Sequence, residues 1–345
     1  NRALAAAPDG SLYVVGGNQW NQIYKVSAAG AVTLFAGASQ TGYSGAGPTP
    51  VLQAQFGAIY GLAVGPDGSV YVSDQGNKRV RKISAAGTVT TIAGTGVTSG
   101  SLEGPGLTTA IPFPSGLDVA PDGTVYVAIA GYYFSGHGGY VAKIATNGQV
   151  SRFVGRADAD WGSHPYGEVG SSTSTDYMTD VAVMPDGSVL VADANNRTVS
   201  RITQDGISTP FAGGGGTLGD GGPATSAQLA FVNTVDLAPD GSVYLGTNAR
   251  IRRVLPDGTI STVAGNGSLV SEAASKKGQP AAQVRVGPVQ ALAITADGSA
   301  HFQDTALGTV IRIANPMPGI ADSDFVVPSD DGGEVYRFDK AGRHL

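Results

Sequence analysis

The sequence predicts an all-β fold, a six-bladed β-propeller of four-stranded antiparallel blades, from three observations. A Pro-Asp-Gly turn recurs from Pro8 onward at intervals of 58, 55, 64, 54 and 57 residues. Short aliphatic runs align on both sides of every copy of this turn. The 345 residues include 52 Gly and 19 Pro but are 41% hydrophobic, which favours short strands joined by many turns around a real core.

The unit is clearest between residues 59 and 94. Four β-branched or aliphatic runs, at residues 62–64, 70–73, 80–83 and 89–93, are each separated by turn residues, as in a meander of four strands. In the first turn Pro66 presets φ, Asp67 can bond its own backbone and Gly68 accepts a left-handed conformation. An Ala-Ala-Gly sequence at residues 85–87 closes the third and fourth strands.

Six copies of this unit align. The turn lies at residues 8–10, 66–68, 121–123, 185–187, 239–241 and, with Ala in place of Pro, 296–298. One column of the second strand reads Tyr13, Tyr71, Tyr126, Leu190, Tyr244 and His301. A basic column in the third strand reads Lys25, Lys82, Lys143, Arg201, Arg253 and Arg312. Because the basic column is present in all six copies, we interpret it as scaffold, with charged ends that reach water or an acidic turn.

Stacking explains why the copies form a ring. A four-stranded sheet with two apolar faces cannot bury both alone, so six such blades stack radially and close. The first strand of each blade then lines the axis, where small residues allow close approach, namely Ala5, Ala63, Ala182 and Ala293. The fourth strand is the outer edge, which is where Pro210 is tolerated.

Long links join the blades, at residues 42–56, 96–113, 213–231 and 265–284. We expect all of them to emerge on one face, which makes that face the expected binding surface. Within the third of these links, Pro223 fits the first turn of a short helix.

Charge and composition exclude several function classes. The chain has 21 basic and 27 acidic residues, and a net charge of −6 gives no electrostatic basis for binding nucleic acid or an anionic membrane. There is no cysteine, and no apolar run approaches the ~20 residues of a membrane span, so no direct membrane insertion is expected. No signal sequence is present, and because residue 1 lies inside a repeat we expect the chain to be a fragment.

Two stretches carry a family resemblance. Residues 74–83 (Asp-Gln-Gly-Asn-Lys-Arg-Val-Arg-Lys-Ile) and 193–202 (Asp-Ala-Asn-Asn-Arg-Thr-Val-Ser-Arg-Ile) resemble the core of the NHL repeat. So does the link Gly-Asp-Gly-Gly-Pro-Ala-Thr-Ser-Ala-Gln-Leu at 219–229. The other blades depart from the Asp-x-x-Asn pattern. The resemblance implies a six-bladed NHL propeller over residues 1–314, a fold whose usual role is to hold partners.

The last residues, 315–345, do not follow the repeat pattern and form a predicted C-terminal extension. Their final phrase, Val-Tyr-Arg-Phe-Asp-Lys-Ala-Gly-Arg-His-Leu at 335–345, resembles the entry into the YD-repeat shell of bacterial teneurin-like and RHS proteins. That resemblance implies an extracellular or cell-surface bacterial protein with an adjoining YD-repeat domain. Alternatively residues 334–338 supply the outer strand of blade six, and both can hold. Blade six can also take this strand from residues upstream of Asn1.

The residues offer few candidates for chemistry. The four histidines, His137, His164, His301 and His344, form no repeat-equivalent set, and His301 replaces a Tyr, which favours a packed or hydrogen-bonded core residue. Asp118 and Asp236 share a column of the innermost strand and are predicted to face the central channel. Two carboxylates there can bind Ca²⁺ with water and carbonyl oxygens, or simply bond neighbouring backbone and water.

The most distinctive predicted surface is aromatic. It comprises an insertion in blade three and the link that follows, with candidate binding residues Tyr132, Tyr133, Phe134, Trp161, His164 and Tyr166. Exposed aromatic rings on a loop face suit a protein or glycan partner. Alternatively these rings pack the insertion onto its own blade.

Three functions remain open. The leading hypothesis is a non-enzymatic propeller without catalytic residues, a protein-interaction and scaffold domain of a larger exported protein that braces the adjoining YD-repeat domain. The second is a propeller lyase or hydrolase with a metal at the central axis. The third is an extracellular ligand-sensing domain of a membrane receptor.

Overall fold

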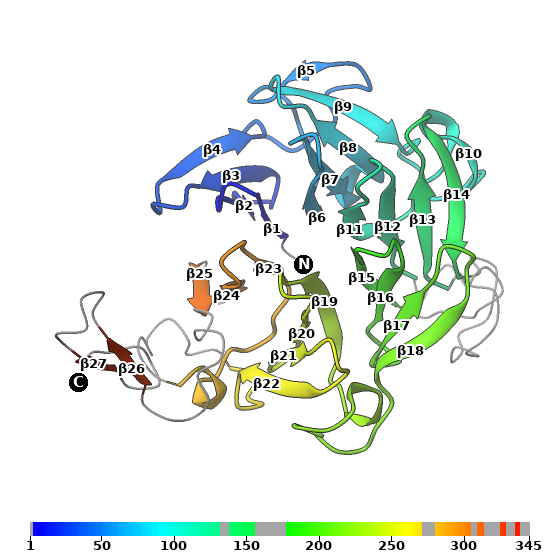
Figure 1. Cartoon of the computed structure of the whole chain (residues 1–345). Coiled ribbons are helices and arrows are strands. Elements are labelled where there is room, and N and C mark those ends of the chain that lie inside the picture. Colours follow the sequence, from blue (N-terminus) through cyan, green and yellow to red (C-terminus); the bar gives the residue numbers. More distant parts are fainter. Residues whose placement is uncertain are drawn as a thin grey trace.

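The computed structural model describes residues 3–131, 138–155, 177–270, 280–304, 309–313, 325–328 and 335–338. Six small antiparallel sheets stand around a central axis, so that the chain forms a ring of six blades (Figure 1). The predicted all-β six-bladed propeller is therefore confirmed.

In every blade the strands of the repeat follow chain order from the axis to the rim. Blade one contains β1 (Leu4–Ala6), β2 (Leu12–Gly16), β3 (Gln22–Val26) and β4 (Val32–Ala36). Blade two contains β6 (Ile59–Val64), β7 (Val70–Asp74), β8 (Arg79–Ile83) and β9 (Thr88–Ala93). Blade three contains β11 (Pro114–Val119), β12 (Val125–Ile129), β13 (Tyr140–Ile144) and β14 (Gln149–Val154).

The second half of the ring has the same order. Blade four contains β15 (Met178–Val183), β16 (Val189–Asp193), β17 (Thr198–Ile202) and β18 (Ser208–Gly213), and Pro210 lies in the outer strand as predicted. Blade five contains β19 (Val232–Leu237), β20 (Val243–Thr247), β21 (Ile251–Val254) and β22 (Ile260–Ala264). Blade six contains β23 (Leu292–Ile294), β24 (Ala300–Asp304) and β25 (Thr309–Ile313).

The Pro-Asp-Gly turn behaves as its chemistry predicts. Gly68 has a φ of 74°, in the left-handed region that closes the reversal. The Asp67 carboxylate accepts a hydrogen bond from the backbone N–H of Ser69 at 3.0 Å. Each turn therefore carries a carboxylate fixed on its surface.

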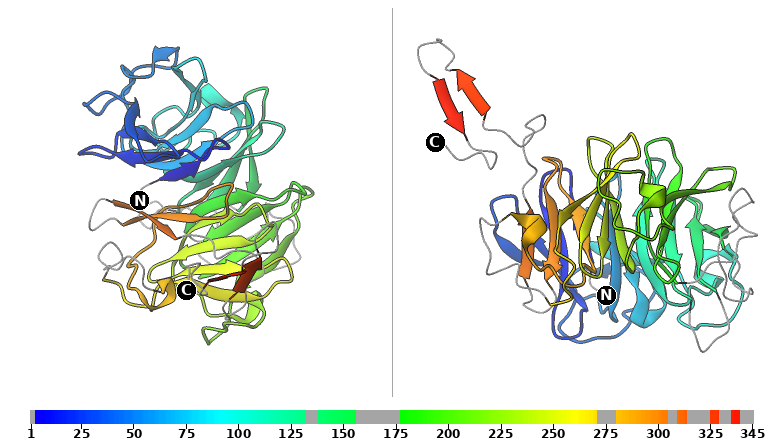
Figure 2. Two further views of the ribbon diagram at one scale, coloured as in Figure 1. Left: turned by 60° about the vertical axis from the view of Figure 1, so that its left-hand side comes forward. Right: turned by 90° about the horizontal axis from the view of Figure 1, so that it is seen from below.

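The turns and links separate onto two faces. Successive strands run in opposite directions, so the hairpin turns after the first and third strands of each blade lie on one face, which we call the turn face. The turn after the second strand and the two ends of each link lie on the other, the link face. The middle of the first link runs along the outer strand as far as the turn face, where Val51 donates to the carbonyl oxygen of Gly87 at 2.9 Å. Figure 2 (right) views the ring edge-on, with loops projecting from both faces.

The links also extend the sheets, which the sequence did not predict. Residues of the first two links form β5 (Thr49–Pro50) and β10 (Gly104–Pro105), which pair with the outer strands β9 and β14 of the blade that follows. Blades two and three are thereby five-stranded. Pro223 lies immediately before the short 3₁₀-helix η4 (Ala224–Ser226), and it bridges to Thr259 beside the outer strand of blade five.

The hydrophobic core lies between neighbouring blades. The tyrosine column faces the next blade, and an outer-strand residue covers it: the ring centroids of Tyr13 and Phe35 are 4.6 Å apart, and those of Tyr126 and Phe153 are 4.9 Å apart. The covering residue sits in each described outer strand at a β-bulge, which redirects its side chain, and these residues are Phe35, Ile92, Phe153, Phe211 and Val263.

The basic column pairs with the turn aspartates. Five ion pairs cross from the third strand to the turn of the same blade: Lys25–Asp9, Lys82–Asp67, Arg201–Asp186, Arg253–Asp240 and Arg312–Asp297. The prediction that the charged ends reach an acidic turn is confirmed for these blades. Such partly exposed pairs contribute only about 0–1 kcal/mol each.

The C-terminal strands form a sheet of their own. β26 (Phe325–Pro328) pairs with β27 (Val335–Phe338), and in the described residues blade six has three strands. Which residues supply a fourth strand to blade six, and whether residues 315–345 begin a YD-repeat shell, stay predictions. No helix within the described ranges has the length and apolar character needed to cross a membrane.

Candidate functional site

The innermost strands of the six blades enclose a central channel with a cavity of about 160 Å³. One side of this channel is lined by small or aliphatic residues such as Ala5, Ala63 and Leu292. The other side carries three carboxylates, Asp118 on β11, Asp180 on β15 and Asp236 on β19 (strands of blades three, four and five). The channel is thus polar on one half of its wall.

Asp118 satisfies amide groups on the free edges of two inner strands. An innermost strand pairs with only one neighbour, so the N–H groups on its channel edge have no partner in the ladder. One Asp118 oxygen accepts from the N–H of Val119 at 2.7 Å, and the other accepts from Val183 of blade four at 2.7 Å. The side chain therefore connects blade three to blade four.

Asp180 makes the same connection one blade further on. Its Oδ1 accepts from the N–H of Val181 at 3.0 Å. Its Oδ2 accepts from the N–H of Val235 at 3.0 Å and from the Thr234 hydroxyl at 2.8 Å, both in blade five. This carboxylate has three hydrogen bonds and joins blades four and five.

Asp236 completes the series. It accepts from the N–H of Leu237 at 2.8 Å within its own strand and from Ile294 of blade six at 2.7 Å. Three consecutive blade junctions are thus tied by one carboxylate each. We refer to Asp118, Asp180 and Asp236 together as the channel carboxylates.

The pKa values of the channel carboxylates are raised above the ordinary value for aspartate. Burial in the ring raises the pKa of Asp118 to about 6, that of Asp180 to about 7 and that of Asp236 to about 8. The hydrogen bonds from backbone N–H groups act in the opposite direction, and the charge of the neighbouring carboxylates raises the pKa of Asp180 and Asp236 further. These groups therefore titrate near neutrality.

The sequence predicted part of this site. Asp118 and Asp236 do line the channel, and their bonds to neighbouring backbone match the simpler of the two interpretations. Their oxygens are engaged by amide N–H groups, and the described part of the chain has no cluster of three His, Asp or Glu arranged to hold a metal ion. Binding of Ca²⁺ in the channel stays a prediction. Asp180 was missed because it lies two positions earlier along its strand, where blade three has Gly116.

The structure does not test the predicted aromatic binding surface. Its residues Tyr132, Tyr133, Phe134, Trp161, His164 and Tyr166, together with His137 and His344, lie outside the described residues. Binding through them stays a prediction. His301 is half-buried on β24 with its Nε2 at 3.2 Å from the Thr295 hydroxyl, which agrees with its interpretation as a hydrogen-bonded core residue.

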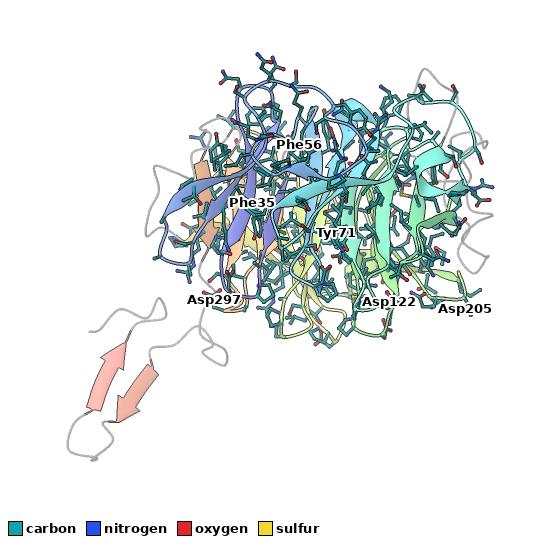
Figure 3. All side chains as sticks on the ribbon, turned by 90° about the horizontal axis from the view of Figure 1, so that it is seen from above. Phe35, Phe56, Tyr71, Asp122, Asp205 and Asp297 are labelled. Atoms are coloured by element: carbon teal, nitrogen blue, oxygen red, sulfur yellow. The ribbon has the colours of Figure 1, made fainter. Side chains whose placement is uncertain are left out.

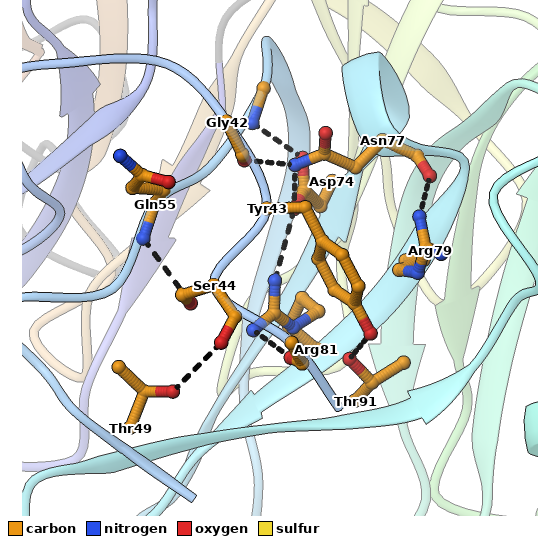
Figure 4. A network of polar contacts seen from close by, with 12 residues as sticks. Gly42, Tyr43, Ser44, Thr49, Gln55, Asp74, Asn77, Arg79, Arg81 and Thr91 are labelled. Carbon is orange, nitrogen blue, oxygen red and sulfur yellow. Dashed lines mark hydrogen bonds and ion pairs between the residues drawn. The ribbon is translucent and has the colours of Figure 1, made fainter. Parts of the chain in front are cut away.

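A buried polar network gives the Asp-x-x-Asn motif its role (Figure 4). The 3₁₀ turn η1 (Gln75–Asn77) brings Asn77 back to Asp74, and its Nδ2 donates to Asp74 Oδ2 at 2.8 Å. Asp74 Oδ1 accepts from the N–H of Gly57 at 2.8 Å. Arg81 Nη1 lies 3.4 Å from Asp74 Oδ2, and both of these side chains are fully buried. In blade two the motif residue Asp74 thus belongs to a buried ion pair at the link face.

The same network holds the first link against blade two. Asn77 donates to the carbonyl oxygen of Gly42 at 2.6 Å, and Arg81 donates to that of Gly45 at 3.3 Å. The guanidinium of Arg79 stacks on the ring of Tyr43 at 3.7 Å from its centroid. Residues 42–45 are therefore fixed by Asn77 of the motif and by the two arginines that follow it.

Blade five repeats this device with other residues. Arg252 occupies the position of Arg81 and donates to Asp220 Oδ1 at 2.7 Å and to the carbonyl oxygen of Leu218 at 2.8 Å. Asp220 is the acidic residue of the Gly-Asp-Gly-Gly link, so the link brings its own counter-ion. These arginines were not predicted as functional from the sequence, although each directly precedes the basic column.

Gly116 makes the Asp180 position possible, which leads to a prediction. A Cβ at residue 116 would overlap the Asp180 carboxylate and lie 2.7 Å from its Cα. We expect Gly116→Ala to lower the free energy of unfolding by about 2–4 kcal/mol, because it combines overpacking with amides left unpaired. Urea unfolding measures this. Gly216→Ala, where an added Cβ meets nothing within 4 Å, is the control, and an equal effect of both changes would contradict the interpretation.

Comparison with known proteins shows similarity to teneurins. Residues 1–84 match the model of the Teneurin NHL domain. Teneurin-m of Drosophila melanogaster is 22% identical over 384 residues, an alignment that covers 99% of this chain, and the chain spans only 13% of the length of that relative.

Solved structures show the same fold at low identity. An auxiliary nutrient binding protein from Bacteroides thetaiotaomicron is 15% identical, with 90% of this chain and 68% of that chain covered and a TM-score of 0.61. A gluconolactonase from Xanthomonas campestris is 14% identical, with coverage of 88% and 82% and a TM-score of 0.53. A streptogramin B lyase is 14% identical, with coverage of 98% and 90% and a TM-score of 0.50. The family match, the teneurin relative and the ring of six blades agree with the repeat motifs: the chain is an NHL-repeat β-propeller that resembles the NHL domain of teneurins.

Proposed function

We propose that the propeller is a non-enzymatic interaction and scaffold domain of a larger exported bacterial protein of the teneurin and RHS type. It offers its link face to a protein or glycan partner and braces an adjoining YD-repeat domain of the same polypeptide. The observation that carries this proposal is the use of the channel carboxylates as ties between blades, since each oxygen accepts at least one hydrogen bond from protein.

Two ion pairs near the link face, one fully buried and one with a buried arginine and an exposed aspartate, support the same role. The Asp74–Arg81 pair and the Asp220–Arg252 pair each hold a link against its blade. A surface built from pinned links keeps its shape when a partner binds, which lowers the entropy lost on association. Rigid loops presented by a closed ring are what an interaction domain requires.

Two resemblances support the proposed placement in a larger surface protein. Residues 335–345 resemble the entry into a YD-repeat shell, and the chain spans 13% of its teneurin relative. The location at the cell surface, the YD-repeat domain and the partner on the link face are parts of the proposal.

Removing the propeller from the full-length protein tests the scaffold role. We expect deletion of residues 1–314 to lower the unfolding temperature of the adjoining domain by several degrees, since a lost interface of a few kcal/mol has effects of that order. Calorimetry of the full-length protein and of the deletion variant measures the change. A variant with Gly216→Ala is the matched control, and an unchanged unfolding temperature after the deletion would overturn the bracing role.

A lyase or hydrolase at the axis is the second candidate, and the observation that favours it is the raised pKa of the channel carboxylates. A carboxyl group that titrates near pH 7 can serve as a general acid or base. Lactones and cyclic depsipeptides, with and without added divalent ions, are suitable trial substrates. The scaffold proposal expects no turnover that depends on the channel. Turnover lost in a folded Asp180→Asn variant would establish the enzyme instead.

A further inference from the structure

A crevice opens on the turn face between blades two and three, with a cavity of about 370 Å³. Its apolar wall includes Tyr71, Ile92, Val125 and Ile144. The turns of the two blades form its rim, and Tyr71 and Asp122 of this region are labelled in Figure 3. The crevice shares no lining residue with the central channel, so it is a separate cavity of the ring.

The next junction, between blades three and four, shows what occupies the corresponding space. There the ring of Phe153, the bulge residue of the outer strand, packs edge-on against Tyr126. Gln204, in the turn before the outer strand of blade four, places its amide nitrogen 3.2 Å from the Tyr126 hydroxyl and also donates to the carbonyl oxygen of Gly187. An aromatic ring and a carboxamide therefore fill this junction from within.

Both of these groups are absent from their equivalent positions at the crevice. The bulge residue of blade two is Ile92, where blade three has Phe153. The turn residue of blade three that corresponds to Gln204 is Thr146, whose side chain is shorter and lies against Gly123. The crevice thus exists where the chain supplies neither the ring nor the amide.

The charges at the rim restrict what can enter. Lys82 pairs with Asp67 at 2.8 Å, and Asp122 lies on the opposite side of the crevice. Lys82 is engaged by Asp67, and the charge of Lys143 acts on Asp122, so each rim carboxylate has a cationic neighbour and neither of these lysines is available to a negatively charged ligand. The rim therefore favours a group that donates N–H over a group that carries a negative charge.

We propose that this crevice binds an aromatic side chain of a partner polypeptide together with its adjoining peptide amide. The ring takes the place that Phe153 fills one blade later and packs against Tyr71, as Phe153 packs against Tyr126. The amide takes the place of Gln204. The site opens on the turn face, beside Gly106 of the second link, whose N–H donates to the carbonyl oxygen of the crevice residue Gly148 at 2.8 Å.

N-acetyl-phenylalanine amide is the probe, because it contains both groups and no charge. We expect saturable binding with a dissociation constant of about 1 mM, the range for a ligand of this size, measured by NMR shifts of residues at the crevice. N-acetyl-phenylalanine, which carries a carboxylate, and N-acetyl-alanine amide, which lacks the ring, are expected to bind more weakly by about tenfold.

Two reciprocal double variants test whether the probe binds in the crevice. Ile92→Phe with Thr146→Gln copies the filled junction into the crevice and is expected to weaken binding at least about tenfold. Phe153→Ile with Gln204→Thr opens the filled junction and is expected to create a second site for the probe. If the double variant does not fold, the single change Ile92→Phe is used in its place, and it too is expected to weaken binding of the probe. No saturable binding to the natural chain, or equal binding to the filled and natural chains, would overturn the proposal.

Discussion

Replacing Arg81 by alanine is expected to lower the free energy of unfolding by about 3–5 kcal/mol, because it leaves Asp74 without its partner in a fully buried position. Burial already raises the pKa of Asp74 and lowers that of Arg81, in each case because desolvation disfavours the charged form. The change also removes the hydrogen bond to the carbonyl oxygen of Gly45, so the first link loses its attachment to blade two.

Denaturant unfolding measures this effect, and two controls separate its causes. Arg312→Ala breaks a pair whose side chains are both more than half exposed, so it should cost less than about 1 kcal/mol. The double change Asp74→Asn with Arg81→Met removes both charges and is expected to cost less than Arg81→Ala alone. Equal losses for Arg81→Ala and Arg312→Ala would show that the buried pair does not hold the link.

The second large effect is a dependence on pH. We expect the free energy of unfolding to fall as the pH rises from about 4 to about 8. The channel carboxylates have pKa values of about 6, 7 and 8 in the ring, against an ordinary value of 3.8. In this range the folded chain therefore binds more protons than the unfolded chain. The free energy of unfolding then declines with rising pH by about 1.4 kcal/mol per pH unit for each proton held in excess.

Below about pH 4 the pH dependence reverses, and the free energy of unfolding declines as the pH falls. Hydrogen bonds within the turn, from the side chain and backbone of Ser11, lower the pKa of Asp9 to about 2, and the pKa values of Asp67 and Asp186 are also lowered. These groups stabilise the fold above their unfolded pKa and lose that contribution as pH falls. Maximal stability is thus expected near pH 4–5.

Thermal unfolding across pH 3 to 9 tests this profile. The Asp236→Asn variant cannot ionise at that position, so its unfolding temperature should decline less from pH 5 to pH 8 than that of the natural chain. Asp205→Asn, on a surface turn of blade four, is the control and should leave the profile unchanged. A natural chain whose stability rises from pH 5 to pH 8 would contradict the raised pKa values.

Much of the fold could be predicted because each blade repeats local chemistry. The strands at residues 59–94 are set by β-branched runs and by a turn in which Gly68 takes a positive φ, and the same pattern occurs in the other blades. The ion pair of Lys82 with Asp67 also follows from one blade alone. Features of this kind need no knowledge of what lies beside the blade.

The remaining features depend on contacts between blades or between a link and a blade. Asp180 has a role only because Val235 of the next blade directs an unpaired N–H toward it. β5 forms because the outer strand of blade two has a free edge for Thr49 and Pro50. The crevice at Ile92 was visible only by comparison with Phe153. The aromatic binding residues predicted in blade three and its link lie outside the described part of the chain and stay untested.

The central claim is that the channel carboxylates tie adjacent blades together through the free amides of the inner strands. Hydrogen exchange of the Val183, Val235 and Ile294 amides, followed by NMR, tests it most directly. The claim predicts that these amides are protected in the natural chain, and that Asp118→Ala, Asp180→Ala and Asp236→Ala each speed exchange first at the amide that lost its acceptor. Unchanged protection of all three amides in these variants would contradict it.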